Sequence, residues 1–207
     1  MKGKADMEDL AVLTGDIVKS RELPPDGLDK AFAALGDAAR RIEAFGGQPA
    51  LLTQARGDGW QMVTAPPFVL RASLTLRAAV RALGKEFDTR IGIGTGPGQI
   101  RSDSLADASG PAFVASGHAL DTMRKGGRMA VEDGSQGLRL AITLANRIVG
   151  GWTSRQAEIA LESLRLPRPT QDQLASHFDT TQQTIQQHWD ASGLPDLLEA
   201  CEMYEDG

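Results

Sequence analysis

The sequence predicts an α+β fold, with a sheet domain in residues 1–150 and an all-α module in residues 151–207. Three observations lead to this prediction. Up to Gly150 and Gly151, apolar residues follow strand and helix periods that begin in the order β-α-β-β-α-β. Beyond these glycines the apolar period is helical only. The charge changes at the same place: residues 1–151 carry 19 basic and 17 acidic side chains, whereas residues 152–207 carry three arginines and ten acidic side chains.

Each element of the sheet domain has its own signal. Residues 10–14 form the apolar run of a first strand, and residues 24–47 combine an entry turn, a helical apolar face and a Gly-Gly stop. Residues 50–55 and 60–65 read as strands flanking the turn "RGDG", which predicts a hairpin. Prolines begin a helix over 66–83 and Gly84 ends it. The remaining expected elements are a strand over 89–96, a helix over 109–123, a strand over 127–133 and a helix over 136–151. The inward face of the first helix is expected to comprise Leu28, Phe32, Leu35 and Ile42.

The first six elements have the order of the ferredoxin-like fold, βαββαβ, followed here by an extra helix and strand. In that fold a right-handed crossover makes the first two strands run the same way, with the third strand returning antiparallel between them. The end of the first strand and the hairpin turn therefore lie at one edge of the sheet. We expect Asp16, in "TGDIVKSR", and Asp58, in "RGDGW", to converge at this edge although they are far apart in sequence.

Two carboxylates at one edge repel each other unless a positive charge lies between them. Mg²⁺ or Mn²⁺ suits such a pair of hard oxygen ligands and is usually shared with substrate phosphates. Lys19, Ser20 and Arg21, just past the first aspartate, are candidates for contact with phosphate oxygens, and Gly57 lets the backbone approach a ligand closely. The alternative is that "GDI" caps a helical turn and "RGDG" is only a hairpin turn.

Four segments also carry a family resemblance: "TGDIVKSR", "RGDGWQMV", "RIGIGTGPGQI" and "SGPAFVASGHALD". In this order they resemble the SatD family and, more distantly, the catalytic domain of class III nucleotidyl cyclases. The resemblance covers about Leu10 to Glu132. It implies that Asp16 and Asp58, assisted by the Ile17 carbonyl, bind Mg²⁺ or Mn²⁺ ions that hold a nucleoside triphosphate.

Three departures from the family patterns argue against catalysis. The cyclases carry an asparagine and an arginine in the helix after the glycine-rich strand, where this chain has Val114 and His118. SatD-like sequences usually have an Ala-Arg pair where this chain has Ser116 and Gly117. Gln54 lies near the position that selects the base, and a glutamine there favours neither purine. Because the arginine stabilises charge in the transition state, the resemblance implies metal or nucleotide binding without efficient cyclisation, and no residue is assigned as catalytic.

The segment "GIGTGPGQI" has alternating glycines and no Gly-Lys-Ser/Thr motif after them. This pattern indicates a strand packed closely by its neighbours more than it indicates a phosphate-binding loop. In the helix that follows, His118 is expected to be a partly buried residue and not a general base, since Asp121 is its one acidic neighbour at helical spacing.

The C-terminal segment resembles helix-turn-helix modules. Helix caps are expected at Thr153 or Ser154, at Thr170, and at Thr180 or Thr181. Asp179 stands where the turn of such a module usually has glycine, and residues 181–189 would form the recognition helix. The expected packing positions are Leu174, Ala175, Phe178 and Ile185, and the candidate contacts to DNA or a partner are Thr181, Gln182, Gln183, Gln186 and Gln187.

The charge of this segment opposes DNA binding, because phosphate contacts by lysine and arginine supply most of the affinity of a DNA reader. The expected recognition helix has neither residue, and Arg155, Arg165 and Arg168 are the only basic residues of the module. The alternative is that these helices pack on the first domain or pair two subunits. Trp152 and Trp189 are expected to anchor that packing.

Composition excludes several classes of protein. The mean hydropathy is -0.24, and no apolar run approaches the roughly 20 residues that span a bilayer. The N-terminus has no apolar stretch typical of a signal peptide. Cys201 is the single cysteine and cannot form an internal disulfide, which together with the missing export signal predicts a cytoplasmic protein. Three scattered histidines and one cysteine provide no zinc ligand set.

Three classes of function follow. The first is a cytoplasmic regulator, in which a cyclase-like domain that senses a nucleotide or metal is coupled to a helix-turn-helix that binds DNA or a partner. The second is a divalent-metal-dependent nucleotide-processing enzyme whose C-terminal helices only dimerise it. The third is a catalytically degenerate interaction protein. The two-part architecture favours the first class, and a homodimer is expected by analogy with cyclase-like domains and helix-turn-helix modules.

Overall fold

The computed structural model describes residues 7–46, 50–101 and 104–207. Residues 1–6, which belong to the N-terminal segment assessed for a signal peptide, lie outside the described residues. So does Gly47, the second glycine of the expected helix stop. Within the described ranges, no helix combines the length and apolar character needed to cross a bilayer.

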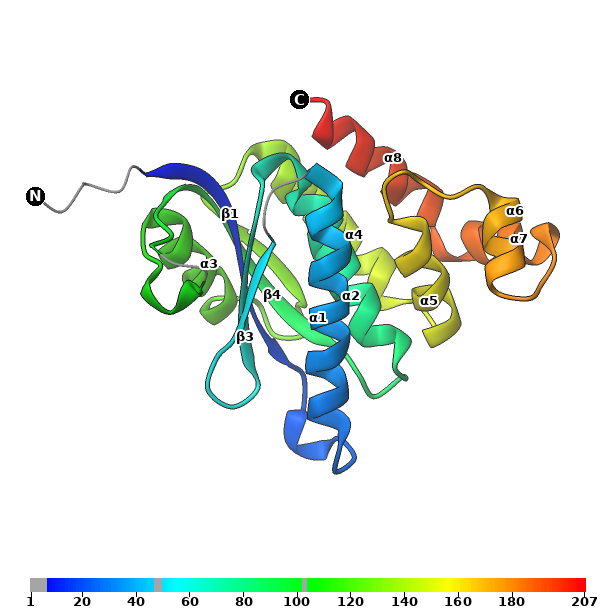
Figure 1. Cartoon of the computed structure of the whole chain (residues 1–207), viewed down its shortest axis with the longest axis horizontal. Helices are drawn as coiled ribbons and strands as arrows, with labels where there is room; N and C mark the ends of the chain where they lie inside the picture. Colours follow the sequence, from blue (N-terminus) through cyan, green and yellow to red (C-terminus); the bar gives the residue numbers. More distant parts are fainter. Residues whose placement is uncertain (1–6, 47–49, 102–103) are drawn as a thin grey trace, which may run out of the picture.

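A five-stranded sheet forms the centre of the first part of the chain (Figure 1). Its strands are β1 (Glu8–Ile17), β2 (Leu51–Gln54), β3 (Gly59–Thr64), β4 (Thr89–Gly98) and β5 (Met129–Glu132). They are arranged in the order β2-β3-β1-β4-β5, with β5 parallel to β4 and every other neighbouring pair antiparallel. The predicted placement of β3 between β1 and β2 is confirmed, and with it the mixed α+β class.

Helices cover both faces of the sheet because the strands are apolar on both sides. Ala11, Leu13 and Ile17 of β1 join the main core, which also contains the buried sides of α1 (Gly27–Gly46), α2 (Val69–Ala82) and α4 (Gln136–Gly150). On the other face, Leu10 and Val12 of β1 pack with Ala112 of α3 (Pro111–Asp121). Figure 1 shows α3 on the opposite side of the sheet from α1 and α2. The helix faces predicted from periodicity are confirmed: Leu35 and Ile42 are buried, and Leu28 and Phe32 pack against the same core.

The glycines of β4 let α3 lie directly on the sheet. A Cβ added at Gly92 would be 2.2 Å from the Ser116 carbonyl oxygen, and one added at Gly94 would be 2.3 Å from the Ala112 carbonyl oxygen. Both atoms belong to the helix backbone, so a side chain at either glycine would push the helix away. The close-packing interpretation of "GIGTGPGQI" is therefore confirmed.

The rest of the chain is helical, with α5 (Ser154–Ser163), α6 (Gln171–His177), α7 (Gln182–Ser192) and α8 (Leu194–Glu205). The predicted caps are found: the side chains of Thr153, Thr170 and Thr181 each accept a hydrogen bond from the first turn of the helix they precede. The described residues also form three short 3-10 helices, Ser20–Glu22, Pro66–Phe68 and Leu105–Asp107.

The C-terminal helices share the main core with the sheet domain. Trp152, Leu164, Leu194 and Cys201 are buried in the same apolar cluster as α2 and α4. Helices α6 and α7 instead pack around a smaller cluster of Ile159, Leu174, Ala175 and Ile185, and lie farthest from α3 (Figure 1). The division into residues 1–150 and 151–207 stays a prediction, as does the assignment of a helix-turn-helix module.

Candidate functional site

The end of β1 and the turn between β2 and β3 lie side by side, as the topology predicts. Asp16 is opposite Gly59 in the register of β1 and β3, and the Ile17 amide donates to the Asp58 carbonyl oxygen at 3.1 Å. The two aspartates therefore belong to neighbouring strand ends at one edge of the sheet. Alternation along β1 places the Asp16 side chain on the face covered by α3.

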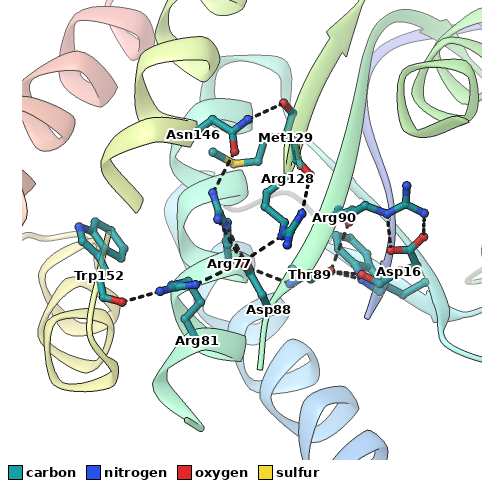
Figure 2. Close-up of polar contacts among 12 residues, drawn as sticks. Asp16, Arg77, Arg81, Asp88, Thr89, Arg90, Arg128, Met129, Asn146 and Trp152 are labelled. Atoms are coloured by element: carbon teal, nitrogen blue, oxygen red, sulfur yellow. Dashed lines mark hydrogen bonds and ion pairs between the residues drawn. The ribbon is translucent and has the colours of Figure 1, made fainter. Parts of the chain in front are cut away.

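The positive charge beside Asp16 is the guanidinium of Arg90. Arg90 lies opposite Asp16 in the register of β1 and β4; its Nε donates to Oδ1 at 2.9 Å and its Nη2 donates to Oδ2 (Figure 2). This pairing raises the pKa of Arg90 above its ordinary value, although partial burial acts the other way. No sequence pattern singled out this residue. Antiparallel pairing of the first predicted strand with the strand predicted over 89–96 would have placed the two side chains together.

Asp58 has a different partner. The Ser20 hydroxyl donates to Asp58 Oδ2 at 2.5 Å, so one of the three residues expected to meet phosphate instead binds the second aspartate. Thr89 ties the two strand ends together, because its hydroxyl donates to the Asp16 carbonyl oxygen at 2.7 Å and accepts from Trp60 Nε1 at 3.0 Å. The backbone at this edge is thus held by side chains as well as by the sheet.

The predicted metal ligands are two carboxylates and the Ile17 carbonyl, all hard oxygen donors that suit Mg²⁺ or Mn²⁺. Arg90 competes for them, since it occupies both carboxylate oxygens of Asp16. Its side chain is 40% exposed and so has room to turn towards solvent. Across the described ranges, no three histidine, cysteine or acidic side chains gather as a metal-binding group. The donor chemistry therefore fits such a cation on condition that the guanidinium moves.

The other residues predicted to contact a nucleotide lie around this edge. Lys19 has a left-handed backbone with φ of 53°, and its exposed ammonium pairs with Glu22 at 2.8 Å. Arg21 and Gly57 are exposed in the turns on either side. Gln54 is opposite Trp60 in the register of β2 and β3, and Trp60 is buried in the main core. Gln54 therefore lies on the α1 face of the sheet, across from the Asp16 carboxylate.

The α3 residues in the positions of the cyclase asparagine and arginine are on the surface. Val114 is 73% exposed. The expectation that His118 is partly buried is wrong: its side chain is 57% exposed, and Nδ1 lies 3.3 Å from a carboxylate oxygen of Glu132 in β5. Sequence spacing pointed to Asp121, but the parallel pairing of β5 with β4 brings Glu132 next to α3.

A second polar cluster, which the sequence analysis also missed, lies on the α2 side of the same edge. The Asp88 carboxylate, just before β4, accepts from Arg77 at 3.0 and 3.1 Å, from Arg81 at 3.2 Å and from Arg128 at 3.3 Å (Figure 2). We call these four residues the Asp88 cluster. Arg77 also donates to the Asn146 side chain of α4 at 3.1 Å. One carboxylate thus faces three guanidinium groups.

The expected recognition helix is exposed but not basic. Gln182, Gln183, Gln186 and Gln187 are all exposed, and Thr181 is the cap of α7. The Gln186 side chain is already bonded to Asp190 at 2.7 Å and to Gln171. Asp179 has φ of 48°, so it adopts the backbone that glycine usually provides in such a turn. The three arginines of the segment are each paired with a carboxylate: Arg155 with Glu158, Arg165 with Glu162 and Arg168 with Glu202.

No family model and no curated protein sequence matches this chain. Similar solved structures include a bacterial light-regulated adenylyl cyclase, which is 18% identical with a TM-score of 0.46; the alignment covers 63% of this chain and 44% of that one. The guanylyl cyclase Cya2 is 17% identical with a TM-score of 0.46, over 61% of this chain and 76% of that one. The GGEEF domain of a diguanylate cyclase from Vibrio cholerae is 14% identical with a TM-score of 0.42, over 62% and 85%. Because these TM-scores are below 0.5, we base the function on this chain's own residues.

Proposed function

We propose that this chain is a regulatory protein whose sheet domain binds a nucleotide together with Mg²⁺ or Mn²⁺ at the edge formed by Asp16 and Asp58. The C-terminal helices then transmit the bound state to a partner. The observation that carries the proposal is the convergence of the two aspartates on adjoining strand ends, joined by the bond from the Ile17 amide to the Asp58 carbonyl oxygen.

The residues at this edge divide the work of binding. The two carboxylates and the Ile17 carbonyl provide the oxygen ligands of the cation, which supplies a counter-charge for the nucleotide phosphates. Arg90 holds Asp16 in place and neutralises it while no cation is bound. Once displaced, the same guanidinium is a donor suited to phosphate oxygens. The edge therefore has two alternative arrangements, as a sensor requires.

A continuous set of hydrogen bonds runs from this edge to the C-terminal helices. The Thr89 hydroxyl binds the Asp16 carbonyl, and the Thr89 amide donates to Asp88 at 2.9 Å. Asp88 accepts from Arg81, whose Nη2 donates to the Trp152 carbonyl (Figure 2). A shift of the strand ends would thereby reach the start of α5. Coupling between the two ends of this route is measured by a double-mutant cycle.

A second link ties the end of the chain to the sheet domain. Arg71 of α2 is fully buried and donates to both carboxylate oxygens of Glu205 in α8, at 2.5 and 2.8 Å. Burial alone lowers the pKa of Arg71, but the pairing more than offsets it, and the net shift is upwards. This ion pair fixes α8 to the sheet domain. A movement caused by ligand binding would therefore displace α6 and α7 more easily than α8.

A protein partner suits the C-terminal helices better than DNA does. All three arginines of the segment are paired with carboxylates, and the exposed residues of α7 are glutamines. DNA affinity depends on lysine and arginine side chains that contact phosphate. Among the described residues, the exposed surface of α7 has no such side chain. If DNA is nevertheless the target, binding should be salt-dependent and be lost when Gln182 and Gln183 are replaced by alanine.

The proposal is tested by thermal unfolding of the full chain with MnCl₂ and a panel of nucleoside mono-, di- and triphosphates. The test variant is Asp16→Asn with Asp58→Asn, and the matched control is Asp9→Asn with Asp107→Asn, two exposed acidic residues elsewhere. A ligand at about 100 times its Kd adds roughly 2.7 kcal/mol, which is about 5–11 °C for a chain of this size. The part of this shift that is lost when EDTA replaces MnCl₂ should appear in wild type and control but not in the test variant. An equal Mn²⁺-dependent shift in all three proteins, or none in wild type, refutes the proposed site.

A further inference from the structure

A cavity of about 860 Å³ opens on the side of the sheet edge that faces α2 and α4. The Asp88 cluster forms its inner wall, and the turn after β1, the turn before β5 and the end of α4 form its rim. Seven cationic side chains line the cavity against three acidic ones. The whole chain has a net charge of -5, so this concentration of positive charge is a local feature and not a consequence of composition.

The inner wall of the cavity carries a net positive charge. Asp88 is the carboxylate that faces Arg77, Arg81 and Arg128, so the Asp88 cluster has an excess of two positive charges. Arg77 is buried, and burial lowers the pKa of its guanidinium although the bonds to Asp88 act in the opposite direction. Like charges held together away from water carry a free-energy cost, which an anion in the cavity would offset.

One donor of the inner wall has no acceptor. The Nε of Arg81 is buried, and within the described part of the chain no atom accepts its hydrogen bond. Its two Nη atoms are already used, one by Asp88 and the other by the Trp152 carbonyl. A buried N–H without a partner is destabilising, so a small anion or an ordered water beside this atom would be stabilising.

The rim adds three further cations. Lys85, Arg124 and Arg147 come from three different segments, and all are exposed. Among the residues that the structure describes, none of the three forms an ion pair with a carboxylate. Unpaired guanidinium and ammonium groups that point towards one cavity are the usual arrangement for holding phosphate.

The lining also indicates which part of a ligand is recognised. None of the described residues that line the cavity is aromatic, and Val18 and Leu23 are its larger apolar residues. Bases are usually held by stacking on aromatic rings and by apolar contacts. The cavity therefore has many cationic donors for phosphate groups but no ring among its described lining residues on which a base could stack. Its volume is in the range of small-molecule sites.

We propose that this cavity is a polyanion site for a ligand with two or more linked phosphate groups, either free pyrophosphate or triphosphate, or the phosphate tail of a nucleotide. The site lies on the opposite face of the sheet from the Asp16 carboxylate and does not depend on a metal ion there. Because Arg81 also holds the Trp152 carbonyl, a bound anion would fix the start of α5 and so stabilise the position of the C-terminal helices.

The test is calorimetric titration of the full chain with sodium pyrophosphate, sodium tripolyphosphate and nucleoside triphosphates, at constant ionic strength and with EDTA present. EDTA removes divalent cations, so the result does not depend on whether Asp16 and Asp58 bind metal. The rim variant Arg124→Ser with Arg147→Ser leaves the buried cluster intact. The control, Arg40→Ser with Arg139→Ser, removes the same charge from exposed positions outside the cavity, the second of them on the same helix as Arg147.

We expect wild type and control to bind pyrophosphate with Kd values within twofold of each other, and the rim variant to bind at least tenfold more weakly. Sulfate at the same ionic strength should bind at least tenfold more weakly than pyrophosphate. Equal affinity for tripolyphosphate and nucleoside triphosphates shows that the phosphate chain alone is recognised, whereas tighter nucleotide binding shows that the nucleoside is recognised as well. No binding by wild type, or the same loss in the control as in the rim variant, overturns the proposal.

Discussion

The substitution Asp88→Asn removes the negative charge from the Asp88 cluster while keeping the size of the side chain. The Asp88 side chain is 13% exposed and Arg77 is 1% exposed, so at least one of its three ion pairs is shielded from water. An asparagine oxygen can still accept from the Thr89 amide, which isolates the loss of charge from the loss of that bond. Three guanidinium groups would then face one another without a carboxylate.

Breaking a buried ion pair by removing one partner costs about 3–5 kcal/mol, because the other charge is left uncompensated. For a chain of this length, each kcal/mol corresponds to about 2–4 °C in Tm, so the variant should melt about 6–20 °C below wild type. The assay is urea unfolding followed by circular dichroism, together with calorimetric Tm values. Asp107→Asn, at an exposed position, should change stability by less than about 0.5 kcal/mol.

The same variant also probes the proposed polyanion site. Pyrophosphate should restore more stability to Asp88→Asn than it adds to wild type, since the anion replaces the missing carboxylate. A destabilisation below about 1 kcal/mol would show that water already screens the cluster. The cluster would then carry no uncompensated charge in the variant.

Three further predictions concern packing, pH and the thiol. Gly92→Ala in β4 should lower the free energy of unfolding by about 1–3 kcal/mol, because the new methyl group would meet the α3 backbone. Gly117→Ala in α3 meets nothing within 4 Å and should raise the free energy of unfolding by about 0.5–1 kcal/mol. Burial alone raises the pKa of Glu162, but ion pairs led by the one with Arg41 lower it below 4.5. Its stabilisation is therefore present above pH 4.5 and lost as the pH falls through the lowered pKa, so Glu162→Gln should flatten the acid limb of a stability-versus-pH curve. Burial raises the pKa of Cys201 to about 12, so a thiol reagent at neutral pH should react only as fast as the protein opens.

Each of these has a result that would contradict it. Equal Tm changes for the two glycine variants would show that α3 is not held against β4. A Glu162→Gln variant that follows the wild-type pH curve in parallel would show that this carboxylate does not titrate differently in the folded state. Rapid modification of Cys201 under native conditions would mean that α8 leaves the core easily.

The fold was largely predictable because its signals are local. Apolar periods located the strands and helices, and side-chain caps such as Thr153 and Thr170 could be read directly from the sequence. The placement of β3 between β1 and β2 then followed from the ferredoxin-like topology. That order was enough to bring Asp16 and Asp58 to one edge, which no local pattern could have shown.

The partners of the charged residues were less predictable. Arg71 and Arg77 lie in an apolar helix that is buried all round, and their charges are matched by Glu205 and Asp88. Helical spacing finds pairs within a helix, but these carboxylates come from other elements whose positions depend on packing. The same reason explains why the partner of His118 was misjudged.

Gln54 illustrates a different limit. The resemblance to cyclases placed Gln54 near the position that selects the base, but a strand alternates its side chains between two faces. In the register with Trp60, Gln54 falls on the α1 face. The side chain of Gln54 is therefore on the other face of the sheet from the Asp16 carboxylate. The strand register was needed to show this.

The proposed function requires the Asp16–Asp58 edge to bind a divalent cation together with a nucleotide. The most direct measurement is the free Mn²⁺ concentration, followed by electron paramagnetic resonance, as wild type and Asp16→Asn with Asp58→Asn are titrated with and without a nucleoside triphosphate. Wild type should bind Mn²⁺ more tightly when the nucleotide is present. Arg90→Met should bind Mn²⁺ more tightly than wild type, because the guanidinium that competes for Asp16 is gone. The double variant should bind no more Mn²⁺ than the nucleotide binds in the absence of protein. Identical titrations for wild type and the double variant would show that Asp16 and Asp58 do not bind the cation.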